Sequence, residues 1–236
     1  VEHLTLSTRV QNAALTTMYG RKGTIAVYNY KTGEILCALT TPTYDPDNVP
    51  DFQADTTGAY KGVYLNRFLQ ATYPPGSIYK IVTCAAALDC VPDIESRTFT
   101  CNGKYTYGTE AITCERAHGT CNLKQALAVS CNCAMAQLSE LVGRKNMQKY
   151  VEQFQVNQRI RFDGVTTAAG NYDISDAGAA SFAWSCIGQH TDLVNPCRFM
   201  VFMGQIAGGG SAAVPYLVSQ VESGAEVVYQ AETTYT

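Results

Sequence analysis

The first forty residues show two different periods of hydrophobic and polar positions. Apolar residues recur at helical spacing from Val10 onward, and Ser7 or Thr8 stands where a helix cap belongs. Residues 23–39 then carry two runs rich in β-branched and aromatic side chains on either side of a polar turn at Asn29–Gly33. This pattern predicts a short helix followed by a β-hairpin.

The stretch Tyr73–Leu88 joins a rigid turn to an apolar helix. Pro74–Gly76 cannot continue any preceding helix, whereas good helix formers follow from Ser77 onward. The expected apolar stripe of this helix is formed by Ile81, Cys84, Ala85 and Leu88. Ser77 is therefore predicted in the first turn of a buried helix, and Lys80 on the same face one turn along.

Ser77 and Lys80 together could act as nucleophile and base. A serine hydroxyl needs a nearby base to take its proton, and a lysine serves only when desolvation or a neighbouring positive charge lowers its pKa. The alternative is purely structural, with Ser77 as a helix cap and Lys80 reaching past apolar surface to solvent. Ser-x-x-Lys alone does not decide between the two.

A second candidate is Ser130-Cys131-Asn132, which lies between two predicted helices. A rigid turn there could aim the Ser130 hydroxyl and the Asn132 carboxamide in one direction. The alternative is that Ser130 or Asn132 only caps the second helix. The remaining elements are predicted as an irregular proline-rich segment 41–50, short strands within 91–120, helices at 122–129, 133–141 and 146–154, a loop at 160–180 and a hairpin at 215–229.

Composition favours one globular domain. The chain has 236 residues, 46% of them hydrophobic and 16% charged, with a formal net charge of −3. This balance gives no reason to expect nucleic acid or an acidic membrane surface as a partner. No apolar run reaches the ~20 residues of a membrane span, and the N-terminus lacks a signal-peptide pattern. We expect any export signal or anchor to precede this chain.

Ten cysteines are more than packing requires. Four of them fall in helical or apolar settings and are expected to be small buried hydrophobes: Cys84, Cys131, Cys133 and Cys186. Cys101, Cys114 and Cys121 fall in a loop, where a Cys101–Cys114 disulfide is one expectation. The spacing Cys114-x-x-x-His118-x-x-Cys121 also raises zinc, but no Cys-x-x-Cys pair supports it, so the sequence predicts no metal site.

Several segments, in order along the chain, resemble the penicillin-binding transpeptidases and the related serine β-lactamases. The blocks that carry the resemblance are Asn66–Phe68 with Pro75–Lys80, His118-Gly119 before Ser130-x-Asn132, Ser185–Gln189 with Pro196–Met200, and Ile206–Gly210. Ser130 lies 53 residues after Ser77, which makes the match specific. One small departure is His190, where the family usually has glycine.

The resemblance implies an α+β fold of the β-lactamase/transpeptidase type, with an antiparallel sheet flanked by helices and a mostly helical subregion. It implies a single domain over residues 1–236. By the same resemblance Ser77 attacks a carbonyl, Lys80 accepts its proton, Ser130 relays a proton to the leaving amine, and Asn132 binds the substrate amide. No metal or organic cofactor is implied. His118 could act as a base by analogy with Ser–His enzymes, but a structural hydrogen bond in its loop is the favoured role.

The implied function is a D,D-transpeptidase that cross-links peptidoglycan, acylated at Ser77 by D-Ala-D-Ala stem peptides and by β-lactams. It would work on the extracytoplasmic face of the bacterial membrane, anchored by an upstream segment, with other cell-wall synthesis proteins as further partners. Two alternatives stay open. One is a serine β-lactamase or β-lactam sensor, and the other is a non-catalytic scaffold of wall synthesis.

The family also uses a Lys-[Ser/Thr]-Gly motif on a strand that follows the nucleophile in chain order. Lys31-Thr32-Gly33 matches the letters but precedes Ser77 and falls on the predicted hairpin turn, so we interpret it as structural. No such motif follows Asn132. We therefore expect the domain to be incomplete at its C-terminus, and residues 1–236 alone to react poorly with penicillin.

Overall fold

The computed structural model describes residues 1–236, and the chain divides into two compact units. The sheet unit consists of residues 1–72, 158–169 and 195–236. The helical unit consists of residues 73–157 and 170–194. The chain therefore passes between the units four times, and each unit is built from segments that are far apart in the sequence.

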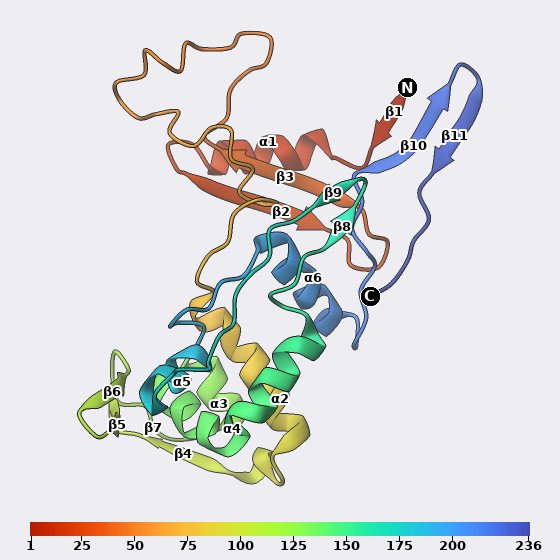
Figure 1. Cartoon of the computed structure of the whole chain (residues 1–236). Coiled ribbons are helices and arrows are strands. Elements are labelled where there is room, and N and C mark those ends of the chain that lie inside the picture. The colour runs from red at the N-terminus through yellow and green to blue at the C-terminus, as the bar shows by residue number, and fades with distance from the viewer. The chain divides into compact units, whose positions relative to one another are not determined.

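Most strands of the sheet unit pair antiparallel (Figure 1). Its elements are β1 (Glu2–Leu4), α1 (Thr8–Thr17), β2 (Gly23–Tyr28), β3 (Ile35–Thr41), β8 (Arg161–Phe162), β9 (Val165–Thr166), α6 (Pro196–Ala207), β10 (Val218–Ser223) and β11 (Glu226–Gln230). β2 pairs with β3, β8 with β9, and β1, β10 and β11 form a three-stranded sheet in the order β1-β10-β11. The predicted hairpins at 23–39 and 215–229 are confirmed.

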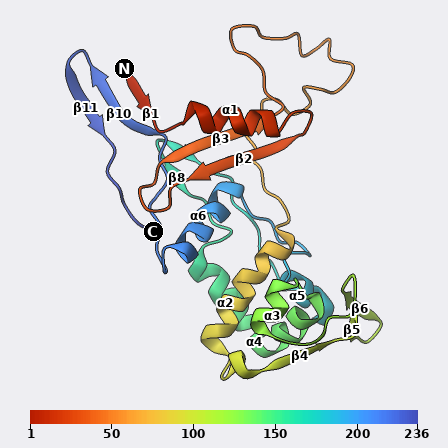
Figure 2. The ribbon, with the colours of Figure 1, turned by 180° about the vertical axis from the view of Figure 1, so that it is seen from behind.

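Helix α1 covers the hairpin of β2 and β3 (Figure 2). Side chains along β3 alternate between buried and half-buried, and Ile35, Cys37 and Leu39 point into the core. Cys37 and Leu39 pack against Ala14 of α1. Ser7 caps this helix by accepting a hydrogen bond from the Val10 N–H, as the sequence predicted.

The turn that carries Lys31-Thr32-Gly33 has a structural role. Lys31 is exposed and its backbone N–H donates to the Asn29 side chain. Gly33 has a φ of +91°, and a Cβ atom there would overlap the Val214 carbonyl oxygen and lie 3.0 Å from the Tyr216 ring, so only glycine fits between this turn and its neighbour. The interpretation of the motif as a hairpin turn is confirmed.

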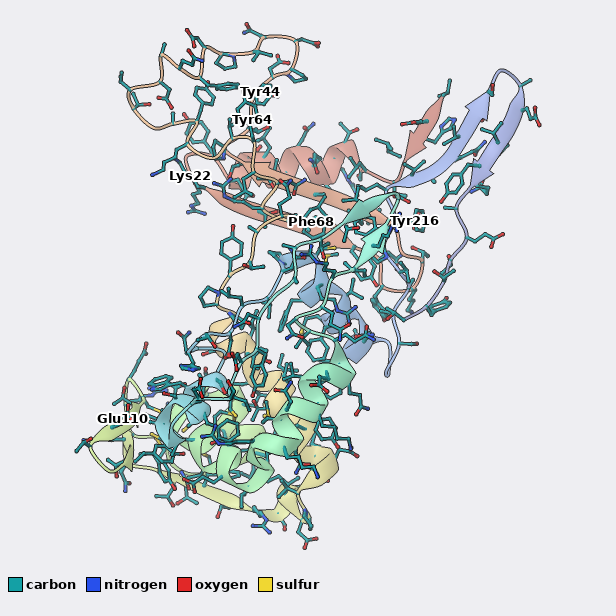
Figure 3. The ribbon with its side chains drawn as sticks, in the orientation of Figure 1. Lys22, Tyr44, Tyr64, Phe68, Glu110 and Tyr216 are labelled. Carbon is teal, nitrogen blue, oxygen red and sulfur yellow. The ribbon has the colours of Figure 1, made fainter.

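Residues 42–72 form a long irregular loop, as the prolines indicated. Its aromatic side chains pack on one another: Phe52 lies 5.1 Å from Tyr44 and 5.3 Å from Tyr64 between ring centroids. Tyr44 and Tyr64 can be followed in Figure 3. Near the end of this loop, buried Phe68 enters the core of the sheet unit together with Val201 of α6.

The helical unit packs four helices with four short strands (Figure 1). Its elements are the 3₁₀ turns η1 (Gly76–Tyr79) and η2 (Ile94–Ser96), the strands β4 (Thr98–Cys101), β5 (Lys104–Tyr107), β6 (Glu110–Thr113) and β7 (Gly119–Asn122), and the helices α2 (Lys80–Cys90), α3 (Leu123–Ala128), α4 (Asn132–Phe154) and α5 (Ala179–Ser185). β4 pairs with β7 and β5 with β6, both antiparallel.

Helices α2 and α4 form the core of the helical unit. Val82 and Ala86 of α2 and Met135 and Leu138 of α4 are fully buried. The two helices predicted at 133–141 and 146–154 are both present, as the two parts of α4 on either side of Gly143, where the backbone has φ 74° and ψ 159°. A residue with a Cβ atom would resist this φ, and the Gly143 backbone is not helical, so the glycine ends the first part of α4 and the second part begins after it.

The α+β fold class is therefore as predicted, with antiparallel strands and helices in both units. The expectation of a single domain over residues 1–236 stays a prediction. None of the helices has both the length and the hydropathy that crossing a membrane would require.

One buried carboxylate in the helical unit lacks a partner. Neither carboxylate oxygen of Asp192 has a hydrogen bond, and the side chain is 1% exposed. The nearby Tyr79 hydroxyl is also buried without a partner. Burial raises the pKa of Asp192 to about 8, because the charged form would lose its hydration without a compensating bond.

Asp192→Asn is expected to increase the free energy of unfolding at pH 8 and to change it little at pH 4. The folded chain keeps the Asp192 proton up to about pH 8, whereas the unfolded chain releases it near pH 4, so stability present at low pH is lost as pH rises between these values. The difference between the two proteins should grow by roughly 2–5 kcal/mol over this range. Urea unfolding at both pH values measures it, with the exposed Asp176→Asn as control. A difference that does not change with pH would contradict the burial argument.

Candidate active site

Ser77 lies in the η1 turn, which leads directly into α2. Pro75 has the φ of −70° that its ring requires, and Gly76 takes a φ of +59° that favours glycine. Ser77 and the following Ile78 are exposed, while Tyr79 and Lys80 are buried. The Pro-Pro-Gly turn thus places the serine at the solvent-facing start of a buried helix, as predicted.

The segment Ile187–Gln189 supports the Ser77 turn through backbone contacts. The Gly76 N–H donates to the Gly188 carbonyl at 2.8 Å. A Cβ atom on Gly188 would overlap the Gly76 carbonyl oxygen and lie 2.5 Å from Tyr79 Cβ, and its φ of +77° also favours glycine. Two segments more than a hundred residues apart therefore touch backbone to backbone at the Ser77 turn.

Lys80 is fully buried, and its ammonium uses all three donors. Nζ donates to the Ser130 carbonyl at 2.7 Å, to Ser130 Oγ at 2.8 Å and to Asn132 Oδ1 at 2.7 Å. Burial lowers the pKa of Lys80 below its usual value, although negative charge on the nearby Cys114, Cys131 and Cys84 sulfurs would act in the opposite direction. Lys80 does not extend to solvent, so the alternative drawn from sequence is wrong.

Ser130 and Asn132 are held by an unusual helix start. Ser130 has a φ of 54°, in the left-handed region that a non-glycine residue occupies at a cost of about 1 kcal/mol. Cys131 is the N-cap of α4, and its Sγ accepts from the Ala134 N–H at 3.3 Å. Since neither Ser130 nor Asn132 caps the helix, both side chains are available to Lys80.

Asn132 is fixed at its other end by a strand. Its Nδ2 donates to the Thr113 carbonyl at the end of β6, at 2.8 Å, while its Oδ1 accepts from Lys80. The carboxamide orientation is therefore determined by one donor and one acceptor. Nothing in the sequence pointed to Thr113.

Ser77, Ser130 and Asn132 line one pocket of about 340 Å³. The other lining residues are Cys114, Glu115, Arg116, His118 and Val129. Lys80 is connected to this pocket through its bonds to Ser130 and Asn132, whereas Ser77 Oγ makes no hydrogen bond in the structure. The structure thus brings the four sequence-derived residues to one place, and their chemical roles stay predictions.

The cysteines in this region differ from the sequence-based expectation. All ten are free, so the predicted Cys101–Cys114 disulfide is wrong. Cys101 Sγ lies 3.5 Å from His118 Nδ1, and Cys114 Sγ lies 3.9 Å from Cys131 Sγ. Cys131 is fully buried as expected, but its thiol is the α4 cap rather than simple core packing.

Comparison with known proteins identifies the family. The penicillin binding protein transpeptidase domain matches residues 23–235. The chain belongs to this family. The peptidoglycan D,D-transpeptidase PbpA of Mycolicibacterium smegmatis is 28% identical over 92% of this chain and 48% of that protein. The stage V sporulation protein D of Bacillus subtilis is 28% identical over 86% of this chain and 31% of that protein.

Solved structures of the family share the fold. The imipenem acyl-enzyme complex of penicillin-binding protein A from M. tuberculosis superposes with a TM-score of 0.86 at 25% identity, over all of this chain and 58% of that one. The D,D-transpeptidase domain of a peptidoglycan glycosyltransferase from Eggerthella lenta superposes with a TM-score of 0.86 at 27% identity, over all of this chain and 61% of that one. The predicted transpeptidase-like fold is confirmed. The chain spans about half the length of the curated relatives named PbpA.

Gly188→Ala is expected to lower the free energy of unfolding by about 3 kcal/mol or more, because the new methyl group overlaps the backbone of the Ser77 turn. Gly164→Ala is the matched control, since Gly164 has a similar φ of +73° with nothing within 4 Å, and only backbone strain of about 1 kcal/mol is expected there. Urea unfolding of both variants makes the comparison. Equal losses would mean that Gly188 is needed for its φ alone.

Proposed function

We propose that this domain carries out the acyl transfer of a serine D,D-transpeptidase that cross-links peptidoglycan. The observation that supports it most strongly is the buried Lys80 ammonium, hydrogen-bonded to Ser130 and Asn132 beside the turn that presents Ser77. A helix cap or a snorkelling lysine would need none of these contacts. The names of the relatives, several of them peptidoglycan D,D-transpeptidases, agree with the assignment.

In the acylation step, Ser77 Oγ attacks the carbonyl carbon of the D-Ala-D-Ala bond in a stem peptide. Lys80, in its neutral form, accepts the hydroxyl proton, and burial favours that form. The 2.8 Å contact between Lys80 Nζ and Ser130 Oγ can carry a proton in either direction, so Ser130 can pass it to the departing D-Ala amine. The C–N bond breaks, and the peptide remains as an ester on Ser77.

The second step releases the peptide to an amine of a neighbouring stem peptide, with the proton transfers reversed. The Asn132 carboxamide would hydrogen-bond the substrate amide, and the Ser77 backbone N–H would contribute one donor to the developing oxyanion. β-Lactams resemble the D-Ala-D-Ala bond and would acylate the same serine, and penicillin-binding protein A from M. tuberculosis forms acyl-enzyme complexes with imipenem and penicillin G.

The cellular location in this proposal follows from the same reaction. Peptidoglycan lies outside the cell membrane, so the domain would work on its extracytoplasmic face, anchored by a segment upstream of residue 1. Other cell-wall synthesis proteins are further partners in this proposal. The negative charge of the chain offers nothing that would recruit nucleic acid.

Ser77→Ala is expected to abolish covalent labelling by a fluorescent penicillin, and Lys80→Met to slow it by about 10²–10⁴, because general-base help is lost while the side-chain length is kept. The measurement is the second-order labelling rate in the complete natural polypeptide that contains these residues, followed by mass spectrometry of the labelled peptide. Lys31→Met, on the hairpin turn, is the matched control and should label at the wild-type rate. No labelling of the wild type would favour a non-catalytic scaffold, and rapid loss of the label would favour a β-lactamase.

The labelling rate of the wild type is expected to rise with pH and level off below pH 10.5, the usual pKa of lysine, since the neutral base accumulates as pH passes the lowered pKa of Lys80. Lys80→Met should lose this dependence. A rate that keeps rising through pH 10.5 would show that Lys80 is not the base.

A further inference from the structure

Four side chains beside the pocket converge on one point. The ligand atoms of Cys101, Cys114, His118 and Cys131 all lie within 4.8 Å of one another. They come from separate segments: Cys101 ends β4, Cys114 and His118 are the first and last residues of the loop between β6 and β7, and Cys131 caps α4. Three thiols and an imidazole brought together in this way form a ligand set of the kind that structural zinc sites use.

Two of the six separations between the ligand atoms are close to those of tetrahedral coordination. Ligands bound to zinc at about 2.3 Å for sulfur and 2.0–2.1 Å for nitrogen lie roughly 3.8 Å apart for two sulfurs and roughly 3.5 Å apart for a sulfur and a nitrogen. In the structure, Cys114 Sγ is 3.9 Å from Cys131 Sγ, and Cys101 Sγ is 3.5 Å from His118 Nδ1. The other separations are at most 4.8 Å, so binding an ion would draw these ligand atoms together by about 1 Å.

The backbone around the four residues favours thiolates. The Cys133 N–H donates to Cys114 Sγ at 3.4 Å and the Ala134 N–H donates to Cys131 Sγ at 3.3 Å. Both donors belong to the first turn of α4, whose first part runs from Asn132 to the break at Gly143, and the N-terminus of such a helix stabilises negative charge. Zinc binds the thiolate form, so these contacts prepare two of the three sulfurs for the ion.

The loop positions are also fixed by backbone bonds. The His118 N–H donates to the Cys101 carbonyl at 3.1 Å, and the Cys114 N–H donates to the Gly103 carbonyl at 3.0 Å. The imidazole and the Cys101 sulfur are thus held next to each other by the pairing of β4 with β7. A metal site needs this kind of support, because ligands on a loose loop lose affinity for the ion.

We propose that Cys101, Cys114, His118 and Cys131 bind a structural Zn²⁺ ion. The ligands differ from the spacing that the sequence suggested, in which Cys121 was the third residue. Cys121 Sγ instead faces the Phe99 carbonyl at 3.8 Å and belongs to the core. With all four positions supplied by the protein, the site is closed, so it stabilises the fold and offers no open position for chemistry.

The ion would act on the pocket through its neighbours in sequence. Cys131 is the middle residue of Ser130-x-Asn132, and Cys114 directly follows Thr113, whose carbonyl holds the Asn132 carboxamide. Zinc would therefore link Cys131, which precedes Asn132, to Cys114, which follows Thr113. This link would keep Ser130 in its left-handed conformation. The ligands are positioning residues for Ser130 and Asn132, and this consequence rests on the proposed function.

The test measures zinc content of the protein purified under reducing conditions and dialysed against a metal-free buffer. About one ion per chain is expected in the wild type. Cys101→Ser, Cys114→Ser and His118→Ala should each lose most of it, while Cys121→Ser, a buried thiol of the same segment, should keep it. Replacing zinc by Co²⁺ in the wild type should give the absorption of tetrahedral cobalt bound to thiolates.

Two further measurements separate the site from its alternatives. Intact-mass analysis of the protein purified without reductant detects a disulfide between Cys114 and Cys131 or Cys133 as the loss of two hydrogens. Thermal melting with and without a strong chelator should show a lower Tm for the metal-free wild type and no effect of the chelator on Cys114→Ser. A wild type without zinc, a disulfide in place of the ion, or equal zinc loss in Cys121→Ser would each overturn the proposal. Because zinc content is read without penicillin, failure of the proposed function would not affect this outcome.

Discussion

The buried ammonium of Lys80 is the interaction on which the helical unit depends. An ammonium removed from water costs several kcal/mol unless each of its protons finds an acceptor. All three acceptors come from the Ser130–Asn132 turn, on the far side of the α2–α4 interface. The packing of α2 on α4 therefore requires this turn to keep its conformation, and the conformation of the turn places a hydroxyl against a lysine whose burial lowers its pKa.

Local chemistry made much of this predictable from the sequence. The Pro-Pro-Gly turn before Ser77, the Ser7 cap and the hairpin around Asn29 are determined by residues close in sequence, and the structure has each of them where it was expected. The predicted hairpin also indicated that Lys31-Thr32-Gly33 is a turn and not the catalytic Lys-[Ser/Thr]-Gly motif. Gly33 is required by its positive φ and by its close contact with the Val214 carbonyl, so these three residues reflect the geometry of the turn and not a catalytic role.

Contacts between distant segments were not predictable in the same way. Gly188 is needed because its backbone contacts that of Gly76. Neither residue has a side chain from which this contact could be predicted. Cys131 was expected to be core because cysteine is usually buried, and it is buried, yet its sulfur caps a helix. The sequence showed three cysteines in a loop but not that β4 and β7 pair, which is the fact that places Cys101 beside His118.

The strain at Ser130 connects these observations. A left-handed φ at a serine costs about 1 kcal/mol and persists only where the surroundings enforce it. On one side of the turn, Lys80 donates hydrogen bonds to the Ser130 carbonyl and hydroxyl. On the other side, the Cys131 sulfur accepts a hydrogen bond from the α4 backbone. If Lys80 becomes neutral during the reaction, the first restraint weakens, because a neutral amine donates one hydrogen bond fewer. The hydrogen bond to the Cys131 sulfur does not depend on the protonation of Lys80. It can therefore keep the Ser130 hydroxyl in position while the neutral lysine donates fewer hydrogen bonds.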